Sequence, residues 1–97
     1  MDMETKCIES LKAVLNRHFS DELFYYGDYK EWAICLQREG KKWLVYHAER
    51  GNHYDEEECL SILDACLHVI RKATCIESEI ALLDEEFYNE LIGRQIA

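Results

Sequence analysis

The chain has 97 residues, of which 48% are apolar and 32% charged, and its formal net charge is −9. A chain of this length can build one hydrophobic core that buries about two-thirds of the surface exposed by its unfolded form, so residues 1–97 are expected to form a single domain. The apolar content excludes wholesale disorder. The acidic excess disfavours direct binding to nucleic acid or to anionic membranes and favours basic partners.

Hydropathy and cysteine content indicate a cytosolic protein. The longest apolar runs, such as residues 80–83, are too short to span a membrane or to act as a secretion signal. The five cysteines are an odd number without secretory context, so we expect reduced and mostly buried thiols rather than a disulfide framework.

The first predicted element is a helix over residues 3–19. Its apolar residues recur at steps of three and four, which is the pattern of one buried helical face. The residues that follow this spacing, all apolar except the histidine, are Met3, Cys7, Ile8, Leu11, Leu15, His18 and Phe19.

The segment "ELFYYGDYKEWAICLQREGKKWLVYHAERG" predicts three antiparallel strands, with "YGDYK" and "REGK" as the turns between them. The predicted register places Glu39 and Gly40 in the second turn, so that large apolar groups share one face. This register pairs Leu36 with Trp43, Ile34 with Val45, and Trp32 with His47.

The opposite face of this predicted hairpin is mixed in character. We expect it to be covered either by a helix of the same chain or by a partner protein. Its residues are Ala33, Cys35, Gln37, Lys42, Leu44 and Tyr46.

Two helices are predicted after the strands. Asp55 with Glu58 three residues later forms a capping-box pattern, so the second helix is expected to begin at Asp55 and to end near Ala73. Residues 74–83 fit either a helix or a short edge strand. A last helix is expected from Asp84 to Gly93.

The predicted fold class is therefore α+β: an N-terminal helix, a three-stranded antiparallel sheet in a β-meander, and two C-terminal helices packed on the sheet.

The cysteine and histidine residues do not form a recognisable metal or catalytic motif. They lack the spacing of zinc ligands, and no glycine-rich phosphate loop or nucleophile elbow accompanies them. We therefore predict no enzyme activity, no cofactor and no metal site. The residues considered for such a site were His47, His53, Cys59, Cys66, His68 and Cys75.

The negative charge is concentrated in the second half of the chain. Residues 55–97 contain eleven acids against Arg71, Lys72 and Arg94, a net charge of −8, whereas residues 1–54 have a net charge of −1. Each acidic group alone is explained by an exposed, solvated helix face, but together they can attract a basic partner. The predicted partner-binding residues are Glu56, Glu57, Glu77, Glu79, Asp84, Glu85, Glu86 and Glu90.

A family resemblance covers residues 32–70. The stretch "WAICLQREGKKWLVYHAERG", followed by the acidic run and by "LDACLHVI", resembles small bacterial immunity proteins of polymorphic-toxin and contact-dependent growth inhibition systems. The tryptophan-containing strand, the "VYHAERG" strand end and the Ala65–Cys66 pair carry the resemblance. It implies a cytoplasmic protein that binds the C-terminal domain of a cognate toxin, often a nuclease, and blocks it without catalysis.

Two other functions stay open. An acidic adaptor or regulatory module could bind a basic protein that is not a toxin, and a small protein could use its cysteine and histidine residues to hold a metal.

Overall fold

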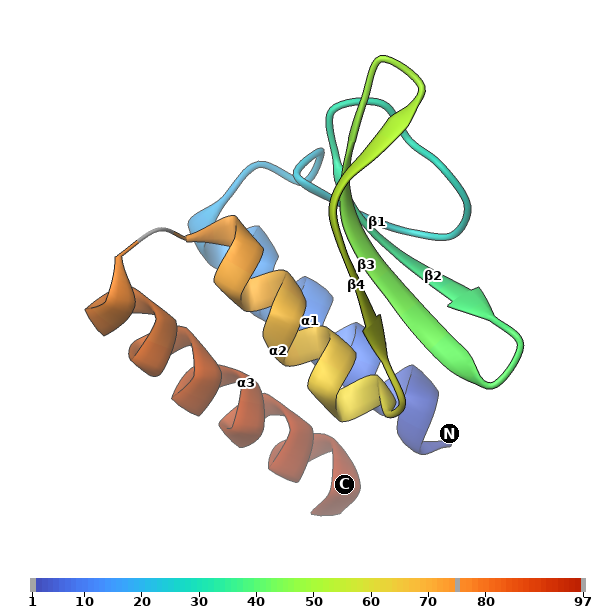
Figure 1. The fold of residues 1–97 in the computed structure, drawn as a ribbon. Helices are drawn as coiled ribbons and strands as arrows, with labels where there is room; N and C mark the ends of the chain where they lie inside the picture. The colour runs from blue at the N-terminus through green and yellow to red at the C-terminus, as the bar shows by residue number, and fades with distance from the viewer. Residues whose placement is uncertain (1, 75, 97) are drawn as a thin grey trace.

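The computed structural model describes residues 2–74 and 76–96, and it contains three helices and four strands in these ranges (Figure 1). Helices α1 and α2 lie beside the sheet, and α3 lies on the side of these two helices away from it. None of the described helices is long and apolar enough to cross a membrane. In chain order the elements are α1 (Met3–His18), β1 (Phe24–Tyr26), β2 (Ile34–Glu39), β3 (Lys42–Glu49), β4 (Asn52–Cys59), α2 (Ile62–Ala73) and α3 (Glu77–Ile96).

Helix α1 matches the predicted first helix to within one residue. Asp2 caps it, because its carboxylate accepts a hydrogen bond of 2.7 Å from the Thr5 N–H. At the other end, the Phe19 N–H still donates to the Leu15 carbonyl. The predicted apolar stripe is buried at Cys7, Leu11 and Leu15 and forms part of the main core.

The sheet has four strands in the order β1-β2-β3-β4, so the predicted three-stranded antiparallel meander is wrong. Strand β1 runs parallel to β2, with Phe24 opposite Ile34 and Tyr26 opposite Leu36. The error arises at "YGDYK", which suggested a tight hairpin turn. Instead, residues 27–33 form a longer loop that returns the chain to the start of β2, so both strands point the same way.

The predicted β2–β3 hairpin exists, but its register is displaced by two residues. Gly40 and Lys41 form the turn, and Leu36 pairs with Val45 rather than with Trp43. A displacement of two keeps every side chain on its predicted face, because side chains alternate with a period of two. Ile34, Leu36, Trp43 and Val45 accordingly share the face that packs against the helices. Trp32 lies outside the strand.

The acidic run at residues 55–58 belongs to β4, so the predicted start of a helix at Asp55 is also wrong. Arg50 and Gly51 have φ angles of 53° and 79° and form a two-residue turn that pairs Glu49 with Asn52. From there β4 follows β3 as far as Cys59, which lies opposite Trp43. Pairing with β3 thus prevails over the local capping pattern.

On the second face of the sheet, Ala33, Cys35, Leu44, Tyr46 and Ala48 form a second buried cluster, to which none of the described helices contributes a residue. Side chains from the β1–β2 loop and from β4 lie against this cluster. Its partly buried neighbour is Tyr29 of the loop between β1 and β2, and the ring of His53 in β4 stacks on Tyr46 with centroids 3.7 Å apart.

Helix α2 begins at Ile62, where the Ser61 hydroxyl caps it by accepting a 3.1 Å hydrogen bond from the Asp64 N–H. It ends at Ala73, where the sequence placed its end. Helix α3 is longer than predicted at both ends, and it continues through Gly93. Only α2 packs on the sheet as predicted. Among the described residues, α3 contacts α1 and α2 but no strand.

The main core joins these layers. Leu11 and Leu15 of α1, Val45 of β3, Val69 of α2 and Phe87 of α3 are all essentially inaccessible to solvent. This packing fixes α3 against the rest of the molecule and leaves Glu77, Glu79 and Glu85 exposed on its surface.

Candidate binding surface

Helix α3 carries six of the eight predicted partner-binding residues. Leu83, Phe87 and Leu91 are buried and anchor one face of the helix. The acids at intervening positions lie around the remaining circumference, as the 3.6-residue period requires. These acids are Glu77, Glu79, Asp84, Glu85, Glu86 and Glu90.

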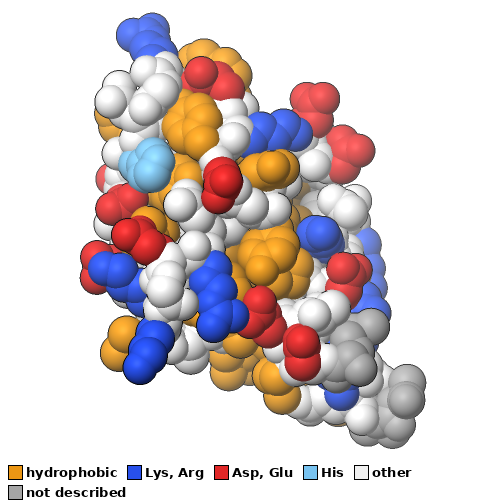
Figure 2. Space-filling model, turned by 90° about the vertical axis from the view of Figure 1, so that its right-hand side faces the viewer, with side chains coloured by type: hydrophobic (Ala, Val, Ile, Leu, Met, Phe, Trp, Pro, Cys, Tyr) orange, Lys and Arg blue, Asp and Glu red, His pale blue; other side chains and the backbone are white. Residues whose placement is uncertain are grey.

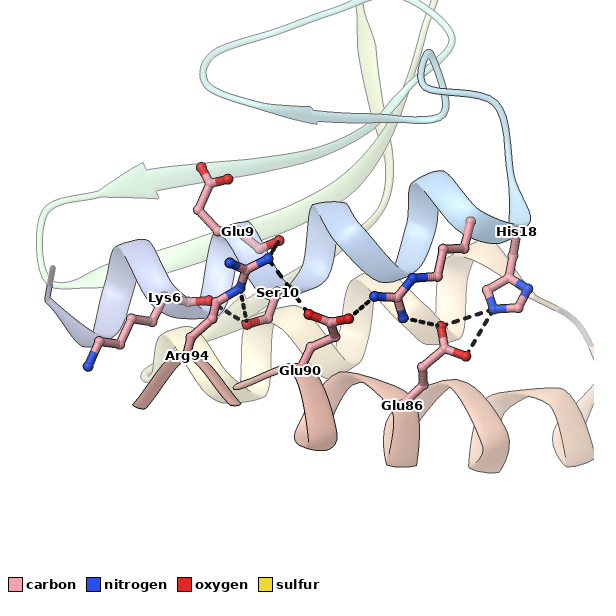
Figure 3. A network of polar contacts seen from close by, with 8 residues as sticks. Lys6, Glu9, Ser10, His18, Glu86, Glu90 and Arg94 are labelled. Atoms are coloured by element: carbon pink, nitrogen blue, oxygen red, sulfur yellow. Dashed lines mark hydrogen bonds and ion pairs between the residues drawn. The ribbon is translucent and has the colours of Figure 1, made fainter. Parts of the chain in front are cut away.

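Two of these acids point towards α1 and are neutralised there (Figure 3). Glu86 accepts hydrogen bonds from Arg17 at 3.2 Å and contacts the His18 ring nitrogen at 3.0 Å. Glu90 pairs with Arg17 and also lies 3.7 Å from Arg94. Both carboxylates therefore hold α3 to α1 and contribute little net negative charge to the surface.

The polar contact between α1 and α3 continues to the C-terminal end of α3. The Arg94 guanidinium donates a 3.1 Å hydrogen bond to the hydroxyl of Ser10, which in turn donates to the Lys6 carbonyl at 2.7 Å (Figure 3). Ser10 is completely buried, so these bonds satisfy a polar group inside the α1–α3 contact.

Asp84 lies on the side of α3 that faces α2. Its Oδ1 atom is buried and has no hydrogen-bond partner among the described residues. Burial raises the pKa of this carboxyl, and the charge of Arg71 partly offsets the effect. Asp84 is therefore poorly placed for direct contact with a partner.

The uncompensated charge on α3 is concentrated in its first turns. The described residues provide no ion pair for Glu77, Glu79 or Glu85, although Glu79 accepts a 3.0 Å hydrogen bond from Thr74. All three residues are exposed. The sequence left the structure of residues 74–83 open, so it did not assign Glu77 and Glu79 to this helix, and fewer acids of α3 are unpaired than the charge count suggested.

The outward side of α3 also carries large apolar residues. Leu82, Tyr88 and Ile92 are 66%, 38% and 50% exposed. A helix of a closed globule would place such residues inwards, whereas an interface helix combines them with polar neighbours. The outer side of α3 therefore has the mixed apolar and acidic character of a binding surface.

Glu56 and Glu57 do not join the α3 residues. They lie in β4, which does not contact α3. Glu56 contacts the His53 ring at 2.7 Å, and Glu57 contacts both His68 and Lys72 of α2. The eight predicted residues thus form two separate groups, with α2 between them (Figure 1).

One cluster contains metal-ligating residue types. The Cys59 thiol, a carboxylate oxygen of Asp64 and a ring nitrogen of His68 lie within 4.8 Å of one another. The two imidazole nitrogens of His68 already face Asp64, at 3.7 Å, and Glu57. Burial, with the nearby Asp64 and Glu57 carboxylates, raises the pKa of Cys59 to about 11. Because ion pairs explain this geometry, it supports no metal assignment.

His47, His53 and Cys66, also considered for a metal site, do not belong to this group of candidate ligand atoms. Cys7, Cys35, Cys59 and Cys66 are free and buried, as predicted for structural thiols. His53 stacks on Tyr46. Cys75 lies outside the described residues.

A shallow depression links α3 to the end of α1; the sequence indicated its acids Glu79, Glu85 and Glu86 as binding residues but missed its apolar residues. It combines Phe19 with Leu82 and Leu83 under an acidic rim formed by Glu79 and Glu85. Phe19 also borders a second depression, whose wall includes Trp32. The sequence placed Trp32 in the sheet because it continues an apolar alternation, although the polar run before it could have indicated a loop.

The chain matches no family model, no curated protein and no solved structure. The resemblance over residues 32–70 therefore remains an expectation drawn from the sequence.

The opposite side of the molecule has a different charge pattern. Figure 2 shows the face on the right-hand side of Figure 1, where basic, acidic and hydrophobic side chains are interspersed. This side includes the β2–β3 turn, next to which Arg38 of β2 pairs with Glu4 and Lys42 of β3 pairs with Glu58. It provides suitable control positions for charge reversal.

Proposed function

We propose that this protein is a cytoplasmic immunity protein that binds and neutralises the C-terminal effector domain of a cognate bacterial toxin. It acts as a stoichiometric inhibitor without catalysis, and the toxin domain is a nuclease. The resemblance over residues 32–70 supports the class of protein, and the acidic composition supports a basic target.

The observation that carries the proposal is the outer side of α3. This helix carries exposed carboxylates at Glu77 and Glu85 and exposed apolar residues at Leu82 and Ile92, and Glu85 follows Leu82 by three residues on the same side of the helix. The buried Phe87 and the contacts with α1 hold this helix in place before any partner arrives. A pre-organised surface loses little conformational entropy on binding, which favours tight association.

A nuclease is the best-matched target for such a surface. An active site that binds phosphate groups is lined with Lys and Arg, and an acidic helix complements it in charge. Covering that cleft excludes the nucleic acid without requiring any chemistry from the inhibitor. Apolar contacts supply much of the affinity, while the carboxylates accelerate the encounter.

The proposal predicts that a toxin gene lies beside the gene for this protein, and the C-terminal domain which that gene encodes provides the test. Co-expression of the wild-type chain should restore growth of cells that produce the domain, and the purified proteins should associate more slowly as salt is raised from about 0.05 to 0.5 M. Failure of the wild-type chain to bind or protect would reject the immunity function and leave an acidic adaptor as the better description.

Charge reversal locates the surface. The double variant Glu77→Lys/Glu85→Lys removes carboxylates without described ion pairs and should slow association at least tenfold. The matched control is Glu39→Lys/Glu58→Lys, which makes the same charge change at exposed residues at the end of β2 and near the end of β4, away from α3 and from the loop before β2. Equal effects of the two variants would indicate a response to net charge rather than a surface on α3.

A further inference from the structure

Trp32 combines a disfavoured backbone conformation with an exposed side chain. Its φ is 67°, in the left-handed region that bulky residues rarely adopt, and 68% of its surface is accessible. The backbone is held there by the Trp32 N–H, which donates a 2.7 Å hydrogen bond to the Ala48 carbonyl. Any residue with an N–H could make this bond, and glycine or asparagine would make it with less strain.

The fold therefore gives no strong reason for an indole at this position. A strained backbone that persists at an exposed site is a sign of function, since the surrounding structure must hold it in place. Tryptophan is also the residue type most enriched among side chains that dominate binding energy at protein interfaces. These two observations point to the Trp32 side chain as a contact residue for another protein.

The surroundings of Trp32 connect it with α3. Phe19 lines two shallow depressions, one bordered by Trp32 and Leu23 and the other by Leu82 and Leu83. We call these two neighbouring depressions together the Trp32–Leu82 surface. It spans the end of α1, the loop before β2 and the first turns of α3, which are far apart in the sequence.

The charges on this surface are mainly negative. Glu22 and Glu31 border the depression at Trp32, while Glu79 and Glu85 border the depression at Leu82. Lys30 also lies there, and its ammonium group is placed over the Tyr25 ring at 5.9 Å from the centroid. An apolar centre with acidic borders complements a segment that has apolar side chains flanked by Lys or Arg.

We propose that the Trp32–Leu82 surface is the main contact for the toxin domain, and that Trp32 is its principal anchor. This inference rests on the proposed immunity function and specifies the surface and the chemistry of the segment it takes. The toxin contributes a basic and apolar segment, whose apolar side chains cover Trp32, Phe19 and Leu82. Its Lys or Arg residues face the four bordering glutamates.

The test uses a catalytically inactive form of the toxin domain encoded beside this protein. Trp32→Gly and Trp32→Asn remove the indole and suit the left-handed backbone, so their melting temperatures should equal or exceed that of the wild type. Their affinity for the toxin domain should fall about 30-fold or more, the loss expected for an anchor residue. A large fall in melting temperature for both variants would overturn the proposal, because the indole would then be needed for folding.

Leu60→Ala is the matched control. Leu60 is 86% exposed and lies between β4 and α2, next to Cys59 and therefore near the Trp43 end of β3 rather than the Ala48 end. Removing this apolar group should leave the affinity unchanged. Equal weakening by Leu60→Ala and Trp32→Gly would show a general response to lost apolar surface and would reject the anchor role.

Tryptophan fluorescence gives a second measurement on the unmodified chain. Trp43 is only 5% exposed, so acrylamide should quench mainly Trp32 in the free protein. Saturation with the toxin domain, prepared without tryptophan, should shield Trp32 and blue-shift its emission. Tight binding that leaves the quenching and emission of Trp32 unchanged would reject the Trp32–Leu82 surface as the contact. Full affinity of the Trp32→Gly variant would reject it as well. Both results would leave the immunity function intact. Absence of binding by the wild-type chain would reject both.

Discussion

The indole of Trp43 is part of the hydrophobic core. It is 5% exposed, lies opposite Cys59 of β4, and has the Arg38 guanidinium over its ring at 5.4 Å and the Tyr26 ring at 6.2 Å. Trp32, eleven residues earlier, lacks comparable burial. The difference arises because β2 begins only at Ile34, so the preceding loop leaves Trp32 outside the alternating pattern of the strand.

Replacing Trp43 with alanine should severely destabilise the domain. The change empties a core site beside Val45, which costs about 3–5 kcal/mol and is a large part of the stability of a small domain. Chemical denaturation followed by circular dichroism measures this loss. Lys42→Ala, at the neighbouring exposed ion pair, is the control and should change the midpoint little. A Trp43→Ala protein that melts like the wild type would place this indole outside the core.

The raised pKa of the Asp84 carboxyl makes the stability of the folded protein depend on pH. Because burial raises its pKa in the folded state above the usual 3.8, the folded protein holds this proton at pH values where the unfolded chain has lost it. The contribution of Asp84 to stability therefore falls as pH rises from 3.8 through the folded pKa, and it remains unfavourable at neutral pH.

The variant Asp84→Asn removes this ionisation while keeping the shape of the side chain. Its melting temperature should exceed that of the wild type at pH 7, and the difference should shrink as the pH approaches 3.8. Glu85→Gln at the exposed neighbouring position is the control and should lack this behaviour. A constant difference between Asp84→Asn and wild type at all pH values would mean that hydrogen bonding by the amide, rather than ionisation, is responsible.

At the level of secondary-structure elements, the sequence predicted one helix from Asp55 to Ala73. In the structure, the first part of this segment belongs to β4 and the rest forms α2. The pattern Asp55-Glu56-Glu57-Glu58 satisfies the rules for a helix start, yet Asp55 has a φ of 51° inside β4. Ser61 performs the capping instead. Local capping rules could not decide between these sites, because the pairing of β4 with β3 depends on residues more than ten positions away.

Substitutions at the two candidate capping residues, Ser61 and Asp55, should have different effects on stability. Ser61→Ala removes the hydroxyl that accepts from the Asp64 N–H and should lower stability by about 1 kcal/mol. Asp55→Gly introduces a residue that adopts positive φ readily, so stability should be retained or slightly increased. Thermal melts of both variants provide the comparison. A destabilised Asp55→Gly protein beside an unaffected Ser61→Ala protein would restore the helix start to Asp55.

For the molecule as a whole, the sequence predicted which strand residues share one face of the sheet. It did not predict the register and direction in which the strands pair. The alternating residues 34–36 and 43–46 identified the buried faces correctly, because the pattern is local. Neither the two-residue displacement of the β2–β3 register nor the parallel direction of β1 changes that pattern. Only the packing of the complete chain distinguishes these arrangements, and sequence periodicity contains no information about it.

The same limit applies to the candidate surface. The sequence assigned Asp84, Glu85, Glu86 and Glu90 to the last helix, as the structure does, but the pairing of Glu86 depends on Arg17, nearly seventy residues away. The exposure of Trp32 depends likewise on where β2 begins. Charge counts therefore showed where acids are concentrated along the chain, while the acids left exposed and unpaired among the described residues emerged only from the fold.

The two edge strands of the four-stranded sheet, β1 and β4, affect the tendency of the protein to aggregate at high concentration. An open sheet edge exposes N–H and C=O groups to which a strand of another molecule can add, and this is a common start of aggregation. Here β1 offers only three residues at one edge, and β4 lines the other with Asp55, Glu56 and Glu58, all exposed. Two molecules that approach through β4 bring like charges together, so the acidity that complements a basic partner also keeps copies of this chain from polymerising with each other.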